Sequence, residues 1–249
     1  MDNVKEGIMS IIYEPLGKAR EYCELAINLY RGCGHGCSYC YAPSVLYMTK
    51  ENFLKAAPRK DIIERLKIEA PKYAGREILL CFTCDPYQPL DDVLQLTRET
   101  IKILHELFIT VRILTKGGKR SMRDFDLLSA NPDKSWYGAT LTFLYYEDWQ
   151  EYEPFADSPL NRLAALNIAH NMGIRTWASL EPVINPEQTL KIIKISYDFV
   201  DVFKIGKWNH DERINKIDWN KFAHDAKNLL DSLGAKYVFK KDLEVYLTK

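Results

Sequence analysis

The sequence predicts a single α/β domain built on a parallel sheet of the kind found in α/β barrels. Six short apolar runs alternate along the chain with amphipathic helical patterns, and this alternation is typical of parallel strands joined by right-handed crossovers. The length of 249 residues lies within the range of one α/β barrel domain. No linker, internal repeat or low-complexity tract interrupts the pattern, so we expect residues 1–249 to form one domain.

The predicted elements follow one another at regular intervals. Strands are expected over residues 25–30, 77–83, 110–115, 136–142, 175–180 and 199–205. Helices are expected over residues 59–69, 92–106, 122–129, 159–171 and 186–196, with residues 145–159 as a long connection. A polar loop over residues 207–216 precedes a last helix near residues 219–233, which Gly234 is placed to end, so that this helix and a short tail occupy residues 217–249.

Charge and cysteine content narrow the function classes. Lys plus Arg and Asp plus Glu both number 34, so the net charge is zero and no broad electrostatic attraction to nucleic acid is expected, although a local basic patch stays open. The first ten residues are charged and lack the apolar core of a signal peptide, and the sequence has no run of about 18 apolar residues that would span a membrane. Six cysteines without a signal peptide therefore predict a reducing, cytoplasmic setting.

Three of the six cysteines lie in residues 31–41, here called the cluster loop, directly after the first predicted strand. Cys33, Cys37 and Cys40 have the spacing C-x3-C-x2-C, with Tyr39 just before the last sulfur. A cubane [4Fe-4S] cluster has four irons, so three cysteines hold three of them and leave the fourth open to a ligand that is not protein. The spacing therefore predicts a reaction site as well as a metal site.

The glycines of the same loop, Gly32, Gly34 and Gly36, allow positive-φ turns that direct backbone amides toward the sulfide charge of a cluster. A structural zinc site is the main alternative. Zinc requires four closed ligands, and His35 lies too near its neighbours to complete a tetrahedron. Disulfides are less favoured still, because three clustered cysteines cannot all pair among themselves. The iron–sulfur interpretation is preferred.

With this motif the chain resembles the radical S-adenosylmethionine (radical SAM) superfamily, whose members share C-x3-C-x2-C with an aromatic residue before the third cysteine. The resemblance implies a partial (β/α)6 barrel of the TIM type with the cluster loop after its first strand. It also implies that the open iron chelates SAM, that the reduced cluster cleaves SAM to methionine and a 5′-deoxyadenosyl radical, and that an external donor of the flavodoxin or ferredoxin type supplies the electron. Cys33, Cys37 and Cys40 would be the ligands, and Tyr39 would lie near the adenine.

Polar residues leaving the second strand extend the predicted site. Two prolines end this strand, so that Cys84 and Asp85 lie at the mouth of the barrel. A carboxylate at this place can accept hydrogen bonds from the ammonium group of SAM. The alternative is an ordinary strand-to-helix turn with Asp91 or Asp92 as the helix cap. The position one strand after the cluster loop favours the site interpretation.

The ends of the later strands carry four further candidates. Lys116 follows the third strand and can bind a carboxylate as a point charge, while Thr140 in the fourth can hydrogen-bond the ribose or the methionine part of SAM. Glu181 follows the fifth strand, where its carboxylate can contact SAM or substrate, and Gly206 after the sixth allows close approach of the adenine. Each of these residues, taken alone, is more typical of a structural position. They are candidates because they lie at the ends of successive strands.

Together these segments resemble one branch of the superfamily, the spore photoproduct lyase-like proteins. The resemblance covers most of the chain: the cluster loop, the T-x-D turn at residues 83–85, the T-K turn at residues 115–116, and the segments at residues 152–154 and 161–165. It implies SAM contacts from Cys84, Asp85, Lys116 and Thr140, with Tyr41 beside the cluster. Cys84 and Thr140 stand where the lyase has serine, and both remain small and polar.

One departure from the lyase changes the expected chemistry. The lyase has a hydrogen-donating cysteine three residues before the aspartate, and this chain has Phe82 there. Cys81 and Cys84 flank that position and are candidate hydrogen-atom donors, with a buried core cysteine as the alternative for Cys81. Strand alternation places Cys81 on the face of Asp85 if the strand stays regular that far. SAM cleavage follows from the resemblance, whereas photoproduct repair itself does not.

The expected substrate is a nucleobase, thymine-derived or otherwise modified, in DNA or in a nucleotide, as the resemblance implies. The candidates for stacking on a base are Tyr145, Tyr146, Trp149 and Trp208, and those for phosphate contact are Lys116, Lys119, Arg120 and Arg123. The alternative is that these aromatic residues pack the barrel rim and the basic residues are solvated.

Two other function classes stay open. One is a radical SAM enzyme that modifies a peptide or a small metabolite, and the other is a non-enzymatic iron–sulfur or zinc-binding protein. Peptide-modifying members often carry additional cysteine-rich extensions, and none follows Cys84 here. A structural metal would not require the polar residues at the strand ends.

Overall fold

The computed structural model describes residues 10–209 and 211–248, and its main sheet confirms the predicted fold class. Eight strands lie in the order β1-β2-β5-β6-β7-β8-β9-β10, and every neighbouring pair is parallel except β1 with β2. The strands are β1 (Ile12–Tyr13), β2 (Ala26–Ile27), β5 (Glu77–Leu80), β6 (Thr110–Thr115), β7 (Ser135–Thr140), β8 (Arg175–Val183), β9 (Val202–Lys207) and β10 (Tyr237–Phe239). Strands β2 and β5 to β9 correspond to the six predicted apolar runs.

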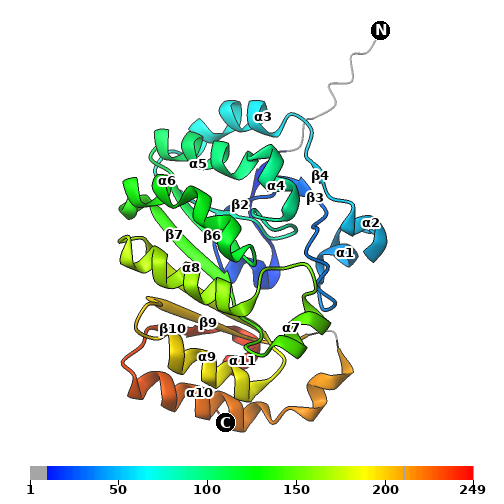
Figure 1. Cartoon of the computed structure of the whole chain (residues 1–249), viewed down its shortest axis with the longest axis vertical. Helices are drawn as coiled ribbons and strands as arrows, with labels where there is room; N and C mark the ends of the chain where they lie inside the picture. Colours follow the sequence, from blue (N-terminus) through cyan, green and yellow to red (C-terminus); the bar gives the residue numbers. More distant parts are fainter. Residues whose placement is uncertain (1–9, 210, 249) are drawn as a thin grey trace.

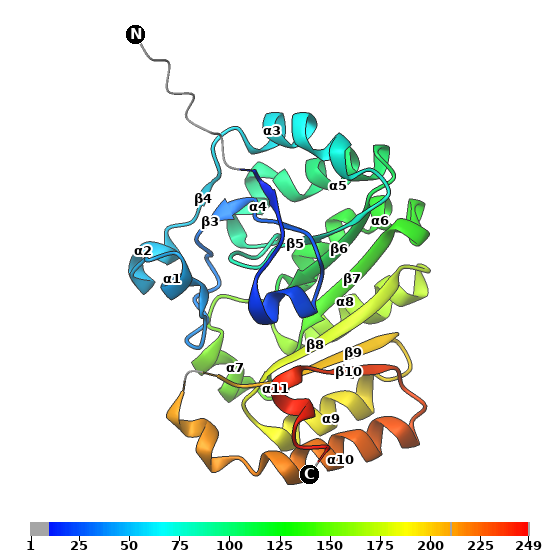
Figure 2. The same ribbon diagram turned by 180° about the vertical axis from the view of Figure 1, so that it is seen from behind.

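Helices cover one face of this curved sheet (Figure 1). The principal ones are α3 (Ile62–Glu69), α5 (Leu96–Glu106), α6 (Phe125–Ala130), α8 (Pro159–Asn171), α9 (Pro186–Ser196) and α10 (Trp219–Ser232). Each of them overlaps a predicted helix. From behind, the opposite face of the sheet is visible, with the first part of the chain crossing in front of it (Figure 2).

Short elements account for most differences from the prediction. The helices not expected as separate elements are α1 (Ala42–Val45), α2 (Lys50–Leu54), α4 (Pro89–Leu94), α7 (Tyr146–Tyr152) and α11 (Lys241–Glu244). Short 3-10 helices form at η1 (Gly17–Glu21), η2 (Ala70–Tyr73), η3 (Gly118–Asp124), η4 (Pro132–Lys134) and η5 (Glu212–Lys216). Strand β3 (Tyr30–Arg31) pairs with β4 (Ala57–Pro58) in a separate ribbon.

Two predicted elements need correction. The helix expected over residues 92–106 is two helices, α4 and α5, because Gln95 between them has a left-handed conformation with φ of 50°. The connection expected over residues 145–159 contains α7. Pro89 starts α4 in the first turn, where its missing N–H is tolerated.

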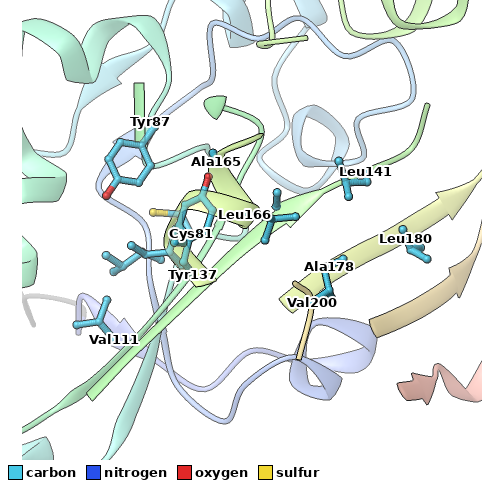
Figure 3. Packing of buried hydrophobic residues seen from close by; sticks show 14 of the residues in the cluster. Cys81, Tyr87, Val111, Tyr137, Leu141, Ala165, Leu166, Ala178, Leu180 and Val200 are labelled. Carbon is cyan, nitrogen blue, oxygen red and sulfur yellow. The ribbon is translucent and has the colours of Figure 1, made fainter. Parts of the chain in front are cut away.

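The curved sheet separates two apolar layers. The larger one fills the space between the strands and the helices, and Figure 3 shows Cys81, Val111, Tyr137 and Leu166 within it. The smaller one lies inside the curve of the sheet and has Trp177 at its centre. Side chains alternate between the two layers along each strand, as the pleat requires.

The described residues also bear on two sequence-based expectations about location. None of their helices is long and apolar enough to cross a membrane. The segment expected to lack a signal peptide, residues 1–10, lies outside the described residues except for Ser10.

Candidate active site at the strand ends

The cluster loop is fixed by backbone contacts just after the β3–β4 ribbon. The Cys33 amide donates to the Phe53 carbonyl at 2.9 Å, and a Cβ on Gly32 would lie 2.5 Å from that oxygen. Gly32 and Gly36 have positive φ angles of 89° and 66°, as expected, whereas Gly34 does not. The turns of the loop therefore depend on two glycines rather than three.

Backbone amides lie close to the thiols of the loop. Burial raises the pKa of the Cys33 and Cys40 thiols, and the backbone amides of His35 and Ala42 act in the opposite direction because they favour the thiolates. Amide donors directed at sulfur are what an iron–sulfur cluster requires of its surroundings. Because a [4Fe-4S] cluster binds its three thiolates on three different irons, the thiols need not converge on one point. The residues of the loop thus fit a three-cysteine cluster.

Lys116 places a positive charge beside this loop. Residues of β6 alternate between buried and half-buried, and Lys116 continues the inner row that holds Arg112 and Leu114. Its Nζ lies 5.6 Å from the centroid of the Tyr39 ring. Burial raises the pKa of the Cys37 thiol to about 12, and the Lys116 ammonium acts in the opposite direction. Lys116 is therefore close to both the aromatic residue and the second cysteine of the motif.

A buried ion pair holds Tyr39 in place. The Tyr39 hydroxyl donates to the Glu153 carboxylate and lies 3.2 Å from the Thr142 hydroxyl. Arg162 Nη2 lies 2.6 Å from Glu153 Oε2, and both side chains are buried. Arg162 Nη1 also donates to the Thr140 carbonyl at 3.1 Å. Burial alone would raise the pKa of Glu153, but Arg162 holds it below its ordinary value, so the carboxylate is ionised.

This pair joins the cluster loop to the end of β7, and sequence reasoning missed it. The resemblance included the segments that carry Glu153 and Arg162 but assigned a role to neither. The sequence did contain an indication of this pair. An acidic and a basic residue lie in two segments that match the branch, and such residues are rare in a protein interior unless they are paired. Thr140 lies at the end of β7, as expected, and is buried there, and its contact with SAM stays a prediction.

Asp85 connects two strand ends with the cluster loop. Its Oδ1 accepts hydrogen bonds from the Thr115 hydroxyl at 2.6 Å and the Tyr87 amide at 2.8 Å. Its Oδ2 accepts from the Lys116 amide at 2.7 Å and lies 3.4 Å from His35 Nδ1. Burial alone would raise the pKa of Asp85, but His35, Thr115 and the Lys116 amide hold it well below its usual range. Protein groups therefore engage both oxygens, and a contact with SAM stays a prediction.

The turn after β5 is organised by Asn28, a residue that sequence reasoning also missed. Its Oδ1 accepts from the amides of Phe82 and Thr83, each at 2.9 Å. Because β5 ends before this turn, the strand alternation expected as far as the aspartate is not kept. Cys81 and Cys84 are both buried in the layer on the helix side, whereas Phe82 packs inside the curve of the sheet. The role of either cysteine as a hydrogen-atom donor stays a prediction.

Glu181 and Gly206 lie side by side on neighbouring strands. A Cβ on Gly206 would lie 2.6 Å from Glu181 Cδ, so this glycine leaves room for the glutamate. The Glu181 carboxylate accepts from the Tyr22 hydroxyl and lies 2.7 Å from Lys240 Nζ. The same tyrosine hydroxyl lies 2.8 Å from the Ser179 hydroxyl. Contacts of Glu181 and Gly206 with SAM stay predictions.

Other candidates lie around this centre. The Tyr41 hydroxyl donates to the Phe82 carbonyl at 3.1 Å, and its ring is exposed beside the cluster loop. Arg123 forms ion pairs with Asp91 at 2.7 Å and with Asp124 at 2.9 Å, so protein carboxylates already neutralise its charge. The structure therefore assigns Arg123 a structural contact instead of an open phosphate site.

Three comparisons relate this chain to known proteins. A family model described as the Radical SAM superfamily matches residues 27–200. An uncharacterised protein of Methanocaldococcus jannaschii is 29% identical over 200 residues, which make up 80% of this chain and 73% of that protein.

Among solved structures, spore photoproduct lyase complexed with dinucleoside spore photoproduct aligns with a TM-score of 0.71 and 14% identity, over 91% of this chain and 80% of the lyase. Streptococcus suis SuiB bound to S-adenosylmethionine aligns with a TM-score of 0.62 and 13% identity, over 86% of this chain. The chain spans about half the length of SuiB, 49%. At such identities these structures share the fold.

Proposed function

The chain belongs to the radical SAM superfamily, and we propose that it is an enzyme that cleaves SAM reductively and uses the radical to abstract hydrogen from a nucleobase. The observation that carries the proposal is the cluster loop, held by Asp85 and lying beside Lys116 at the carboxyl ends of parallel strands. In α/β barrels this end carries the chemistry.

The chain's own residues divide the work of binding. Cys33, Cys37 and Cys40 would hold a [4Fe-4S] cluster, which when bound supplies the electron that cleaves SAM. Lys116 offers a point charge to the SAM carboxylate, and Tyr39 offers a ring face that its hydroxyl contacts keep in one orientation.

Further SAM contacts are proposed at the other strand ends and in the cluster loop. Thr140 and Cys84 supply small polar side chains at their strand ends, and Tyr41 supplies an exposed ring beside the cluster loop. Asp85 fixes the cluster loop and the Lys116 backbone, and its proposed ligand contact is with the SAM ammonium. The proposed partner in electron transfer is a flavodoxin or ferredoxin type of donor.

A thymine-derived or modified nucleobase, in DNA or a nucleotide, is the proposed substrate. Spore photoproduct lyase, which shares the fold, has been solved with a dinucleoside photoproduct. Exposed aromatic residues lie near the strand ends, among them Tyr41, Tyr145 and Tyr146, and aromatic rings stack on bases of any sequence. Phe82 stands where the lyase has its hydrogen-donating cysteine. We therefore propose that the substrate radical either rearranges or takes a hydrogen atom from Cys81 or Cys84.

A peptide substrate is the second candidate. SuiB, which also shares the fold, has been solved bound to its precursor peptide SuiA. The two candidates separate in one experiment, because each predicts a different source of the hydrogen abstracted by the radical.

The test is anaerobic reconstitution with iron and sulfide, followed by reduction in the presence of SAM and mass spectrometry of 5′-deoxyadenosine. With an oligonucleotide whose thymine methyl groups are deuterated, we expect deuterium in 5′-deoxyadenosine. Deuterium from a labelled peptide, and none from the oligonucleotide, would favour the second candidate. Absence of 5′-deoxyadenosine from protein that carries its full iron content would refute SAM cleavage itself.

A further inference from the structure

A short segment between β1 and β2 closes the open side of the barrel. Residues 16–22, here called the N-terminal strap, include η1 and cross in front of the inner face of the sheet (Figure 2). At its far end Lys204 Nζ on β9 donates to the carbonyls of Glu21 and Tyr22 at 3.3 and 3.0 Å. The amide of Lys241, in α11 beyond β10, donates to the Glu21 carboxylate at 3.1 Å. The strap thus links the two edges of the sheet.

The strap inserts one aromatic ring, Tyr22, into the curve of the sheet. Lys240 Nζ lies over one face of this ring at 3.8 Å from its centroid. The ring centroids of Trp177 and Phe82 lie 5.7 and 5.9 Å away, at interplanar angles of 53° and 65°. The hydroxyl meets Ser179 at 2.8 Å and donates to Glu181. These five neighbours, from β8 and from the segments after β5 and β10, are here called the ring site.

Glu181 and Ser179, which contact the Tyr22 hydroxyl, belong to the sheet and not to the strap. Glu181 is paired with Lys240 at 2.7 Å, and Gly206 on the next strand leaves the space that its side chain occupies. Ser179 is buried within β8. An acceptor and a hydroxyl therefore face the site from the sheet itself.

Outside Tyr22, the strap is held by the Lys204 and Lys241 hydrogen bonds and by an exposed ion pair of Arg20 with Glu14 at 3.1 Å. Its 3-10 turn has no side-chain cap, and Leu16 at its start is 85% exposed. The strand before it, β1, is only two residues long. None of the strap residues whose burial is described is fully buried, and a segment of this kind lies lower in local stability than the buried strands.

The ring site also adjoins the predicted reaction centre. Phe82 forms one wall of the site, and its carbonyl accepts the hydroxyl of Tyr41, which follows the third cysteine of the motif. Glu181, which accepts the hydrogen bond of the Tyr22 hydroxyl, lies at the carboxyl end of β8, where radical SAM chemistry is expected. A planar ring held here is therefore linked to the cluster loop through Phe82 and Tyr41.

We propose that Tyr22 occupies the place of the substrate's planar ring, and that the N-terminal strap withdraws when the substrate binds. The Glu181 carboxylate, paired with Lys240, accepts hydrogen bonds and donates none, so the ring that replaces Tyr22 must carry a donor at the matching edge. An imide N–H flanked by carbonyl oxygens, as in thymine, donates to Glu181 and offers a carbonyl to Ser179, while Lys240 lies over the ring face as it does for Tyr22. This inference rests on the proposed function, because it names the ring class that the nucleobase substrate presents.

Calorimetric titration of the cluster-loaded protein with thymidine tests the proposal. In the wild type Tyr22 competes with the ligand, so the apparent affinity is reduced by the fraction of molecules in which the site is open. We expect Tyr22→Ala to bind thymidine about tenfold more tightly or better. The added methyl of N3-methylthymidine removes the imide donor, so it should gain nothing from the substitution. Para-cresol, which reproduces the lost side chain, should compete with thymidine in Tyr22→Ala at a concentration about tenfold lower than in the wild type.

Tyr197→Ala, an exposed tyrosine after α9, is the matched control and should leave thymidine affinity unchanged. Equal thymidine affinity of the wild type and Tyr22→Ala would overturn the proposal, and so would an equal gain for N3-methylthymidine. If Tyr22→Ala does not fold, hydrogen exchange of the wild type decides. Saturating thymidine should then speed exchange of the strap amides, and unchanged or slower exchange would overturn the proposal.

The deuterated-oligonucleotide assay separates this proposal from the proposed function. Deuterium transfer to 5′-deoxyadenosine without a thymidine gain in Tyr22→Ala would uphold the nucleobase function and reject the ring site. A thymidine gain that depends on the imide donor, without deuterium transfer, would uphold the ring site and reject hydrogen abstraction from thymine.

Discussion

The buried Glu153–Arg162 pair provides the sharpest test of how this site is held together. Neither side chain is exposed to solvent, and the charged atoms lie 2.6 Å apart. Removal of one partner of a buried pair costs about 3–5 kcal/mol, because the other charge is left in the interior. Glu153→Gln keeps an acceptor for Tyr39, so its cost should lie near the lower end. Arg162→Met also takes a donor from the Thr140 and Asp157 carbonyls, so its cost should lie near the upper end.

The double variant Glu153→Gln/Arg162→Met distinguishes the charge effect from a general packing loss. With both charges gone, only the two unsatisfied carbonyls remain, at about 1 kcal/mol each. We therefore expect a loss of about 2–3 kcal/mol, well below the sum of the single losses, in urea unfolding of the cluster-free protein. An additive double variant would refute the reasoning, as would Glu153→Gln within about 1 kcal/mol of the wild type. The control is Glu187→Gln, which breaks the exposed i,i+4 ion pair of Glu187 with Lys191 on α9. This substitution should change the free energy of unfolding far less.

Three further predictions concern the site and its surroundings. Cys37→Ala should lose most of its iron in anaerobic reconstitution, whereas Cys23→Ala, a buried cysteine away from the cluster loop, should keep full iron content. Lys116→Ala should keep the cluster but bind SAM about 10–100-fold more weakly, since it loses a charged hydrogen bond, and an unchanged affinity in equilibrium dialysis would contradict that role. Burial, with Arg112, lowers the pKa of Lys204 to about 8, so between pH 8 and about 10.5 the unfolded chain keeps a proton that the folded chain has lost. Wild-type stability should therefore rise by up to about 3 kcal/mol over this range relative to Lys204→Met, and parallel pH profiles would disprove it.

The fold could be predicted because its determinants are local. A buried parallel strand is an apolar run, and a covering helix shows apolar residues at helical spacing, so each element is visible in its own residues. The boundaries failed where a single residue overrides its neighbours. Gln95 breaks a helical pattern by adopting a left-handed conformation, which a glutamine side chain gives no reason to predict. The two-residue β1 and three-residue β10 are too short to show a period.

The candidate site was predictable in part. Residues that lie close together in the sequence, or at equivalent strand ends, were predicted, and contacts between residues far apart in the sequence were missed. The cysteine motif lies within eight residues, and the strand-end residues share a position that the topology alone brings together. Asn28 meets Phe82 across 54 residues and Tyr22 meets Glu181 across 159 residues, so no spacing rule connects them. Their side chains are also ordinary for turns and barrel rims, which is why sequence reasoning treated Glu181 as open to SAM.

That difference changes the chemistry expected of the site. Sequence reasoning assigned Asp85 to SAM and Glu181 to SAM or substrate, and in the structure both carboxylates have protein donors. The donors of Asp85 are backbone amides and core side chains that cannot leave without unfolding the strand ends. One donor of Glu181 is Tyr22, on a segment that can leave while the sheet stays intact. If both carboxylates are equally structural, Asp85→Asn and Glu181→Gln should lower the unfolding free energy to a similar extent. We expect Asp85→Asn to be markedly more destabilising in urea, and equal losses would argue that Glu181 is not held in reserve for a ligand.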